Sequence, residues 1–463
     1  MRRSSSNSVA LLLMCSLALG GCAQFSADGG LGKVSDLARQ NILRINDVKS
    51  AKIIADEMRL TLVQELTADT AVRIALLNNQ ALQASLAEIG ISEADLVRAG
   101  RLPNPLLSFS RISGANLEIE SAIGFDFLAL LTMPKRIKIE RQRFLQVQQQ
   151  AALAAVQLAT KTRRAYFNAV AAIESAHYLR QASEATSAGA ELAAEMKKAG
   201  NWSALDAMRQ QALFHDALTQ SELAEQIRLA ALEELAQLLG LEDVASIKLP
   251  DRLPELPSAL QQFDNPAQMA IDQRLDVHIA RTNTIALAEA LGLAKSTAMV
   301  DAIRLSYQNK STSGEQRADG FGVSLMLPLF DWTNAKSRRA QDQYLQAVYR
   351  SADVAIRARS DARTAYAARK TTHALALHYR DTLVPTRKQI SDETLLRYNG
   401  MLISVFELLL DARNQILAVN SAIQASRDYW LAESNWQMAL HGGTMVMNIS
   451  PAAAPAVSMP VGH

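Results

Sequence analysis

The chain of 463 residues is poor in cysteine, poor in aromatic residues and nearly balanced in charge. Its two cysteines, Cys15 and Cys22, both stand near the N-terminus, so the rest of the chain can hold no disulfide. Aromatic residues make up only 5%, which is low for a large globular core but compatible with alanine-rich coiled coils. The net charge is +2, with basic and acidic residues interspersed. This argues against a nucleic-acid partner, which needs basic residues clustered on one face.

Long apolar runs are also scarce. One run, from Val9 to Leu19, follows Arg2 and Arg3; it is too short to span a bilayer and has the flanks of a signal peptide. After it no run of eighteen apolar residues occurs, so no transmembrane helix is predicted.

The apolar run leads to Leu19-Gly20-Gly21-Cys22, which resembles a bacterial lipobox. Residues 1–21 are therefore predicted to be a lipoprotein signal peptide, and Cys22 to be an acylated N-terminus that carries diacylglycerol and an N-acyl chain such as palmitate. Ala23 is not the aspartate associated with inner-membrane retention, so the resemblance implies the outer membrane. The alternative is an ordinary secretory signal with a chance cysteine.

Proline and glycine are almost absent from one very long stretch, residues 135–199. Ala, Leu, Gln, Glu, Lys and Arg dominate it; these residues lose little side-chain entropy in a helix, so a single coiled-coil helix of roughly 95 Å is predicted. A near copy, residues 335–399, follows two hundred positions later, and the two copies end at Gly200 and Gly400. Pro385 lies inside the second copy and predicts a kink or local unwinding there.

Before each long stretch the apolar period changes to two, which predicts a strand hairpin. The predicted strands are about 106–113, 118–131, 302–310 and 320–330. Along the second strand, apolar Ile119, Ile123 and Phe125 alternate with polar residues, the apolar-out, polar-in pattern of a transmembrane barrel strand. The residues predicted to line the lumen are Glu118, Glu120, Asp126 and, from the third strand, Arg304. Four strands leave open edges, so several copies are expected to share one barrel.

The same order of predicted elements occurs twice along the sequence: helix, strand hairpin, long helix, glycine turn, helix. The predicted segments are a signal peptide (1–21), an N-terminal anchor and equatorial segment (22–66), a first repeat (67–249), a proline-rich linker (250–265), a second repeat (266–442) and a disordered tail (443–463).

This plan resembles the TolC-type outer-membrane efflux family over residues 66–442. The local motifs that carry the resemblance are Ala71-Val72-Arg73-Ile74-Ala75-Leu76 with Asn78-Asn79, Leu102-Pro103-Asn104-Pro105, Leu327-Pro328-Leu329-Phe330-Asp331, and Tyr398-Asn399-Gly400 followed by Ser404. The resemblance implies a mainly α fold in which a duplicated long helical barrel carries four strands per chain. Three copies would then form a homotrimer with a 12-stranded β-barrel in the outer membrane of a Gram-negative bacterium. The implied partners are a periplasmic adaptor (membrane fusion) protein and an inner-membrane pump of the RND type.

In this family the glycine turns form the periplasmic tip, where the tunnel closes and the adaptor docks. The resemblance therefore assigns tip and docking roles to Gly200, Trp202, Ser203, Gly400, Met401 and Ser404. Three acidic residues beyond them are expected to form a channel constriction that favours cations when three copies meet: Asp206, Glu407 and Asp411. The alternative is an acid solvated at a helix N-terminus, which the helix dipole favours in any case.

No Ser/His/Asp grouping, metal cluster or phosphate loop converges, so neither an enzyme nor a metal site or cofactor is expected. His373 and His378 are five residues apart and do not share a helix face, which favours two solvated histidines. The function expected is a passive exit duct of a tripartite efflux or secretion system, with heavy metals and drugs as open alternatives for the cargo. The competing function is a pore-less structural lipoprotein tether that spans the periplasm, although a tether has no use for strands of this pattern.

Overall fold

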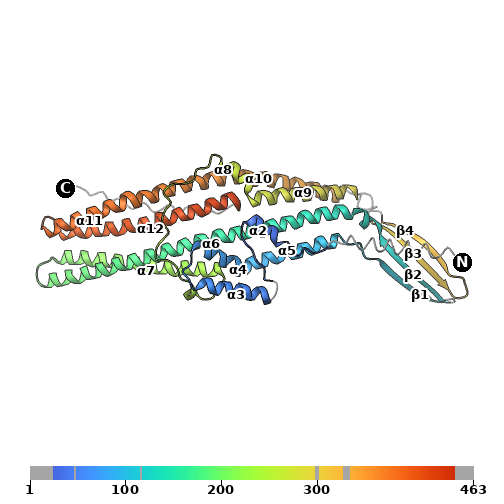
Figure 1. Ribbon diagram of the computed structural model, residues 1–463, viewed down its shortest axis with the longest axis horizontal. Coiled ribbons are helices and arrows are strands. Elements are labelled where there is room, and N and C mark those ends of the chain that lie inside the picture. The colour runs from blue at the N-terminus through green and yellow to red at the C-terminus, as the bar shows by residue number, and fades with distance from the viewer. Residues whose placement is uncertain (1–23, 46–47, 115–116, 298–301, 327–333, 444–463) are drawn as a thin grey trace.

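The computed structural model describes residues 24–45, 48–114, 117–297, 302–326 and 334–443, and these form a long rod of helices with a sheet at one end (Figure 1). In the first half the elements are α2 (Leu31–Ala38), α3 (Val48–Leu62), α4 (Ala68–Asn78), α5 (Gln80–Ala99), β1 (Leu106–Ser113), β2 (Leu117–Asp126), α6 (Phe127–Lys198) and α7 (Ala204–Leu239). In the second half they are α8 (Pro266–Gln273), α9 (Leu275–Ser296), β3 (Ala302–Thr312), β4 (Ala318–Met326), α10 (Asn334–His378), a π-helical turn (Tyr379–Leu383), α11 (Val384–Asn399) and α12 (Val405–His441). The predicted signal peptide and nearly all of the predicted tail lie outside the described residues.

The two repeats lie side by side along the rod. In each repeat one long helix forms the spine, and shorter helices pack along it: α4, α5 and α7 against α6, and α8, α9 and α12 against α10 (Figure 1). The buried side of α6 consists mostly of small side chains, such as Ala152 and Ala159, with two aromatic rings, Tyr166 and Phe167. Alanine at such positions lets helix axes approach closely over a great length, so this low-aromatic sequence still buries a continuous core.

Two predicted boundaries were wrong. The second strand, predicted as 118–131, ends at Asp126, where α6 begins. The Asp126 carboxylate accepts a hydrogen bond from the Ala129 N–H at 2.8 Å and so caps the helix, while the following residues, 127–131, are apolar at every position and show no alternation. The helix predicted before the first hairpin is broken at Asn79, whose side chain caps α5 through the Leu82 N–H at 3.1 Å.

The proline-rich linker predicted at 250–265 lies across both repeats. On the first repeat, the Leu253 N–H donates to Glu174 at 3.2 Å. On the second, Trp430 donates to the Pro254 carbonyl at 3.3 Å and Arg369 to the Gln261 carbonyl at 3.1 Å. These bonds join the repeats near the middle of the rod.

Among the described helices, none combines the length and the apolar character needed to cross a membrane.

Candidate functional site

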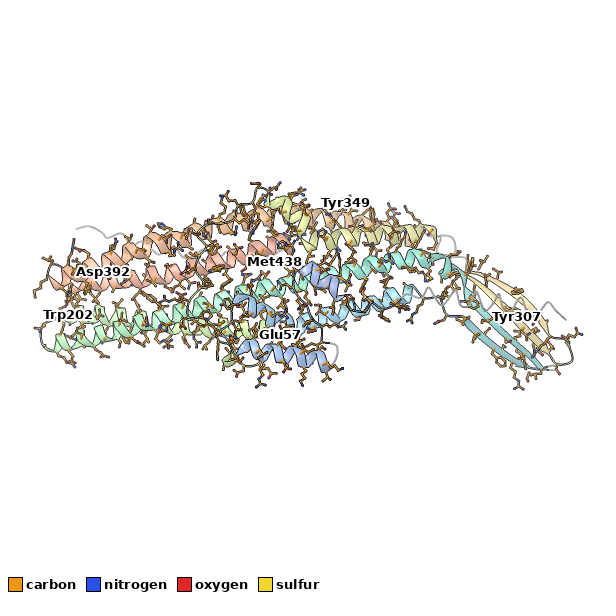
Figure 2. All side chains as sticks on the ribbon, in the orientation of Figure 1. Glu57, Trp202, Tyr307, Tyr349, Asp392 and Met438 are labelled. Atoms are coloured by element: carbon orange, nitrogen blue, oxygen red, sulfur yellow. The ribbon has the colours of Figure 1, made fainter. Side chains whose placement is uncertain are left out.

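The four strands form one antiparallel sheet in the order β1-β2-β3-β4 at the end of the rod opposite the helical turns. Tyr307 on this sheet and Trp202 in the first helical turn mark the two ends (Figure 2). The register pairs Ile123 with Leu107 on β1 and with Tyr307 on β3, while the neighbouring Ala122 pairs with Ser108 and Gln308. Because successive residues of a strand point to opposite faces, the sheet has one mainly apolar and one mainly polar face.

The apolar face is largely uncovered by the rest of the chain. Phe321 is 90% exposed, and its ring centroid lies 5.5 Å from that of Tyr307, with the two rings tilted by 57°. The other large exposed side chains on this face are Leu107, Phe109, Phe125, Leu305, Val323 and Leu325. A contiguous apolar surface of this kind marks a site of contact with a membrane or another protein.

The four predicted lumen residues all fall on the polar face. Glu118 and Glu120 meet Lys310 of β3, which forms an ion pair with Glu118 and lies 3.3 Å from Glu120. Asp126 is opposite Arg304 in the register, and its carboxylate also caps α6. The sequence prediction does not include Lys310 among the lumen residues, although its even position, in phase with Arg304, indicates the same face of the strand.

The first helical turn has the geometry that glycine allows. Gly200 has φ of 77°, and the Asn201 N–H returns to the Met196 carbonyl at 2.9 Å while the Gly200 N–H returns to Lys197 at 3.0 Å. This is a Schellman ending, which places a left-handed residue just after the helix. Ser203 then caps α7 through the Asp206 N–H at 3.1 Å.

The second turn repeats this geometry one residue later than the sequence predicts. The left-handed residue is Met401, with φ of 58°, and Gly400 keeps an ordinary φ of −80°. The Leu402 N–H returns to the Arg397 carbonyl at 2.9 Å, and Ser404 caps α12 through the Glu407 N–H at 3.4 Å. Matching Gly200 with Gly400 was therefore wrong: the structural equivalent of Gly200 is Met401.

The three predicted constriction acids differ in their surroundings. Glu407 is exposed in the first turn of α12, whereas Asp206 lies 3.7 Å from Arg209. Asp411 is only 8% exposed, and its Oδ2 has no hydrogen-bond partner among the described residues. Of these three acids, only Glu407 presents its carboxylate freely at the end of the rod.

Two further predictions concern sites away from the tip. Cys22, the predicted lipidation site, lies outside the described residues. His373 was expected to be solvated, but it is 7% exposed, and its Nε2 bonds to the Pro257 carbonyl of the linker at 2.8 Å. Across the described part of the chain, no group of three or more His, Cys, Asp or Glu side chains is arranged to hold a metal ion.

Several solved structures have the same architecture. A membrane protein from Pseudomonas aeruginosa is 22% identical, with a TM-score of 0.70 over 81% of this chain and 93% of that chain. The Campylobacter jejuni CmeC outer membrane channel is 18% identical, with a TM-score of 0.64 over 89% of this chain and 86% of that chain. The open state of the Neisseria gonorrhoeae MtrE outer membrane channel is 18% identical, with a TM-score of 0.67 over 81% of this chain and 89% of that chain.

This chain has the TolC-type channel fold. No protein-family model matches the sequence, and no curated protein matches it either. The likeness therefore lies in the fold, and the predicted architecture of long helices carrying four strands is confirmed.

Proposed function

We propose that the chain is the outer-membrane exit duct of a tripartite efflux or secretion system. The observation that carries this proposal is the two-faced sheet at the end of a helical rod. An apolar face suits lipid and a polar face suits a water-filled lumen. The channel fold shared with the CmeC and MtrE outer membrane channels supports the same function.

In this proposal three copies assemble into a homotrimer. The outer strands of the sheet, β1 and β4, each have only one neighbour within the chain, and unpaired edges are not tolerated in lipid. Three chains would contribute twelve strands to one barrel, which is wide enough to hold water. The helical rods would then surround a tunnel through the periplasm.

The chain would be held in the outer membrane of a Gram-negative bacterium by the barrel and by lipid on Cys22. The turns at Gly200 and Met401 would form the periplasmic tip, where an adaptor protein docks and an inner-membrane pump, of the RND type, delivers cargo. Glu407 is the strongest candidate for an acidic constriction, because its carboxylate is exposed. Asp206 and Asp411 are weaker candidates, since the first has an arginine neighbour and the second is buried.

Single-channel recording tests the duct. The purified protein in a planar bilayer is expected to give discrete conductance steps, and liposomes that contain it are expected to swell in small solutes. A Glu407→Ala variant is expected to conduct with weaker preference for cations. A pore-less tether, the alternative, would give neither steps nor swelling, and that outcome would overturn the proposal.

A further inference from the structure

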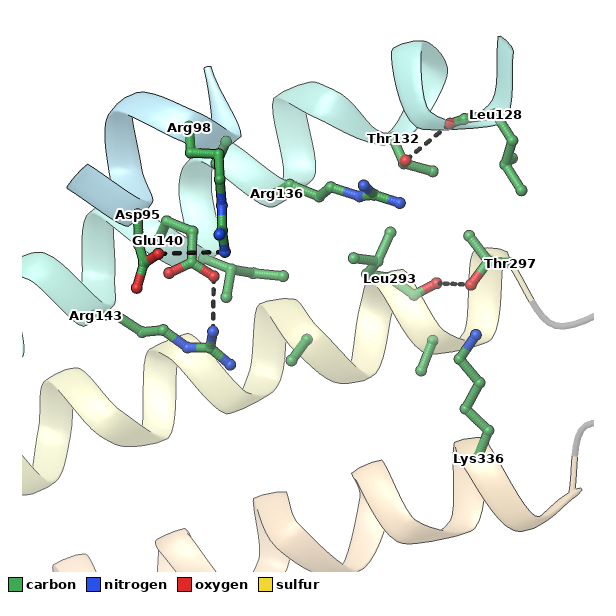
Figure 3. A pocket seen from close by; sticks show the side chains of 14 residues that line it. Asp95, Arg98, Leu128, Thr132, Arg136, Glu140, Arg143, Leu293, Thr297 and Lys336 are labelled. Carbon is green, nitrogen blue, oxygen red and sulfur yellow. Dashed lines mark hydrogen bonds and ion pairs between the residues drawn. The ribbon is translucent and has the colours of Figure 1, made fainter. Parts of the chain in front are cut away.

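A cavity of about 570 Å³ lies between α5, α6, α9 and α10, close to where the helices meet the sheet (Figure 3). Six charged side chains line it, and four of them are basic. The basic residues are Arg98, Arg136, Arg143 and Lys336, and the acidic residues are Asp95 and Glu140. The lining therefore has an excess of two positive charges.

The two acidic residues neutralise only part of the positive charge that lines the cavity. Arg98 lies 3.3 Å from Asp95, and Arg143 lies 2.7 Å from Glu140. Arg136 has no hydrogen bond or ion pair within the described chain, and Figure 3 shows it extended between α6 and α9. Lys336 reaches toward Thr297 from the other side of the cavity. A guanidinium with all its donors available suits a phosphate, sulfonate or carboxylate group.

The cavity-lining residues of α5 and α6 project away from the side that the N-terminal segment covers, as helix geometry indicates. That segment is held against α5 by the Ser26 N–H, which donates to Glu93 at 2.6 Å, and against α6 by Gln148, which donates to the Gly30 carbonyl at 2.9 Å. Glu93 and Asp95 project from α5 about 200° apart, because each residue of an α-helix turns the chain by about 100°. Gln148 and Arg136 project from α6 about 120° apart by the same rule.

This orientation decides which side of the duct the cavity faces. Ser26 is only four residues from the predicted lipid anchor at Cys22, which allows at most about 14 Å of chain. An anchor in lipid must lie outside the helical cylinder, so the face covered by the N-terminal segment is the outer one. In the proposed trimer the cavity, whose lining projects from the other side of α5 and α6, would open into the tunnel.

We propose that this cavity binds the anionic group of cargo inside the duct, so that the duct carries molecules bearing a phosphate, sulfonate or carboxylate. The proposal rests on the exit-duct function. Three copies would place a basic collar where the tunnel enters the barrel, between the acids of the tip and the Glu118 and Glu120 pair of the sheet. Such a ring of basic residues raises the local concentration of anions and provides a transient binding site for them along the channel.

The test is block of single-channel current by pyrophosphate, the probe anion, in a bilayer of neutral lipid. Pyrophosphate is expected to block the wild-type channel, and Arg136→Gln is expected to raise the half-blocking concentration roughly tenfold, as loss of a charge-assisted hydrogen bond implies. Arg136→Lys keeps the charge and is expected to retain part of the block. Arg141→Gln is the matched control, because Arg141 is an exposed arginine of α6 that does not line the cavity.

Equal block of the wild type and Arg136→Gln would overturn the proposed anion site and leave the duct intact. Loss of the wild-type block when the bilayer contains anionic lipid would also overturn it, because a lipid headgroup would then occupy the site. Absence of any conductance from the wild-type protein would instead overturn the proposed exit-duct function. Calorimetric titration of the detergent-solubilised protein with pyrophosphate tests the cavity without a channel: heat from the wild type that Arg136→Gln loses supports the site, and no heat from either overturns it.

Discussion

A single left-handed residue at the second tip turn carries a backbone cost that the first turn avoids. Met401 is 93% exposed, so its side chain contributes little packing, yet a side chain at positive φ costs about 1–2 kcal/mol. Met401→Gly is expected to stabilise the protein by about 1 kcal/mol, since glycine adopts this conformation without a steric penalty but adds freedom to the unfolded chain. Thermal unfolding followed by circular dichroism measures the change.

The reciprocal substitution is Gly200→Ala. A methyl group at Gly200 would meet no atom within 4 Å, so any loss comes from the backbone alone. The expected destabilisation is about 1 kcal/mol. If both variants changed the melting temperature in the same direction, the assignment of Met401 as the equivalent of Gly200 would lose its energetic basis.

His441, the last residue of α12, links stability to pH. Burial and the nearby positive charge of Arg39 lower the pKa of its imidazole below the ordinary value of 6.5. The unfolded chain therefore takes up a proton more readily than the folded chain. The contribution of His441 to the free energy of unfolding is expected to be fully present above pH 6.5. It is expected to decrease as the pH falls through the pKa of the folded state, with a slope of at most about 1.4 kcal/mol per pH unit.

The comparison that checks this is the melting temperature of the wild type and His441→Gln between pH 7.5 and pH 5. The melting temperature of the wild type is expected to decrease relative to that of His441→Gln as the pH falls. His378→Gln is the control, because His378 lies exposed on α10. Parallel curves for the wild type and His441→Gln would rule out a contribution from His441.

At the level of whole elements, the π-helical turn explains why the two repeats differ in spacing. Tyr166 and Tyr366 are separated by 200 positions, whereas Ser203 and Ser404, which cap equivalent helices, are separated by 201. One extra residue must therefore be absorbed between them. The turn at Tyr379–Leu383, where the Val384 N–H bonds to the Tyr379 carbonyl, adds one residue to the helix without rotating α11 about its axis. Pro385 lies just after it and has no N–H to offer a regular helix.

Removing the extra residue is expected to leave the fold intact. Deletion of Thr382 together with Pro385→Ala should give a continuous helix with unchanged packing of α11 on α12. The matched control is deletion of Ala182, the equivalent position in the regular helix α6, which would rotate the following residues by about 100°. That rotation turns the small buried side chains beyond it, such as Ala190 and Ala193, out of the helix packing at about 0.8 kcal/mol per CH2-sized group, so the control is expected to unfold at lower temperature. Equal damage from the two deletions would contradict the role of the π-helical turn.

These elements also show what could be predicted from the sequence. The helix patterns and the two hairpins follow from local periodicity, so the long spine and the four strands were predicted close to their observed places. The exact tip turn was not, because the local sequence favours Gly400 as the left-handed residue, whereas the observed position at Met401 depends on the π-helical turn some twenty residues earlier. The burial of His373 depends on where the linker crosses the rod, which is a tertiary contact with no local pattern.

At the scale of the whole assembly, the two faces of the sheet give neighbouring residues opposite environments. Ile123 belongs to the apolar face beside Leu107 and Tyr307, and Ala122 belongs to the polar face beside Ser108 and Gln308. If the apolar face meets lipid, Ile123→Arg places a charge in the hydrocarbon layer at a cost of about 2–4 kcal/mol in each copy. Three copies would multiply this cost, so the variant is expected to fail to form membrane-inserted trimers.

Ala122→Arg adds the same side chain one residue away and is expected to insert normally, because it would point into water. Its conductance is expected to shift toward anions, since each trimer would gain three positive charges in the lumen. The measurement is the amount of membrane-inserted trimer for each variant, followed by the reversal potential in a salt gradient for those that insert. Insertion of both variants in equal amounts would mean that the apolar face does not meet lipid, and the sheet would then have to be covered by protein.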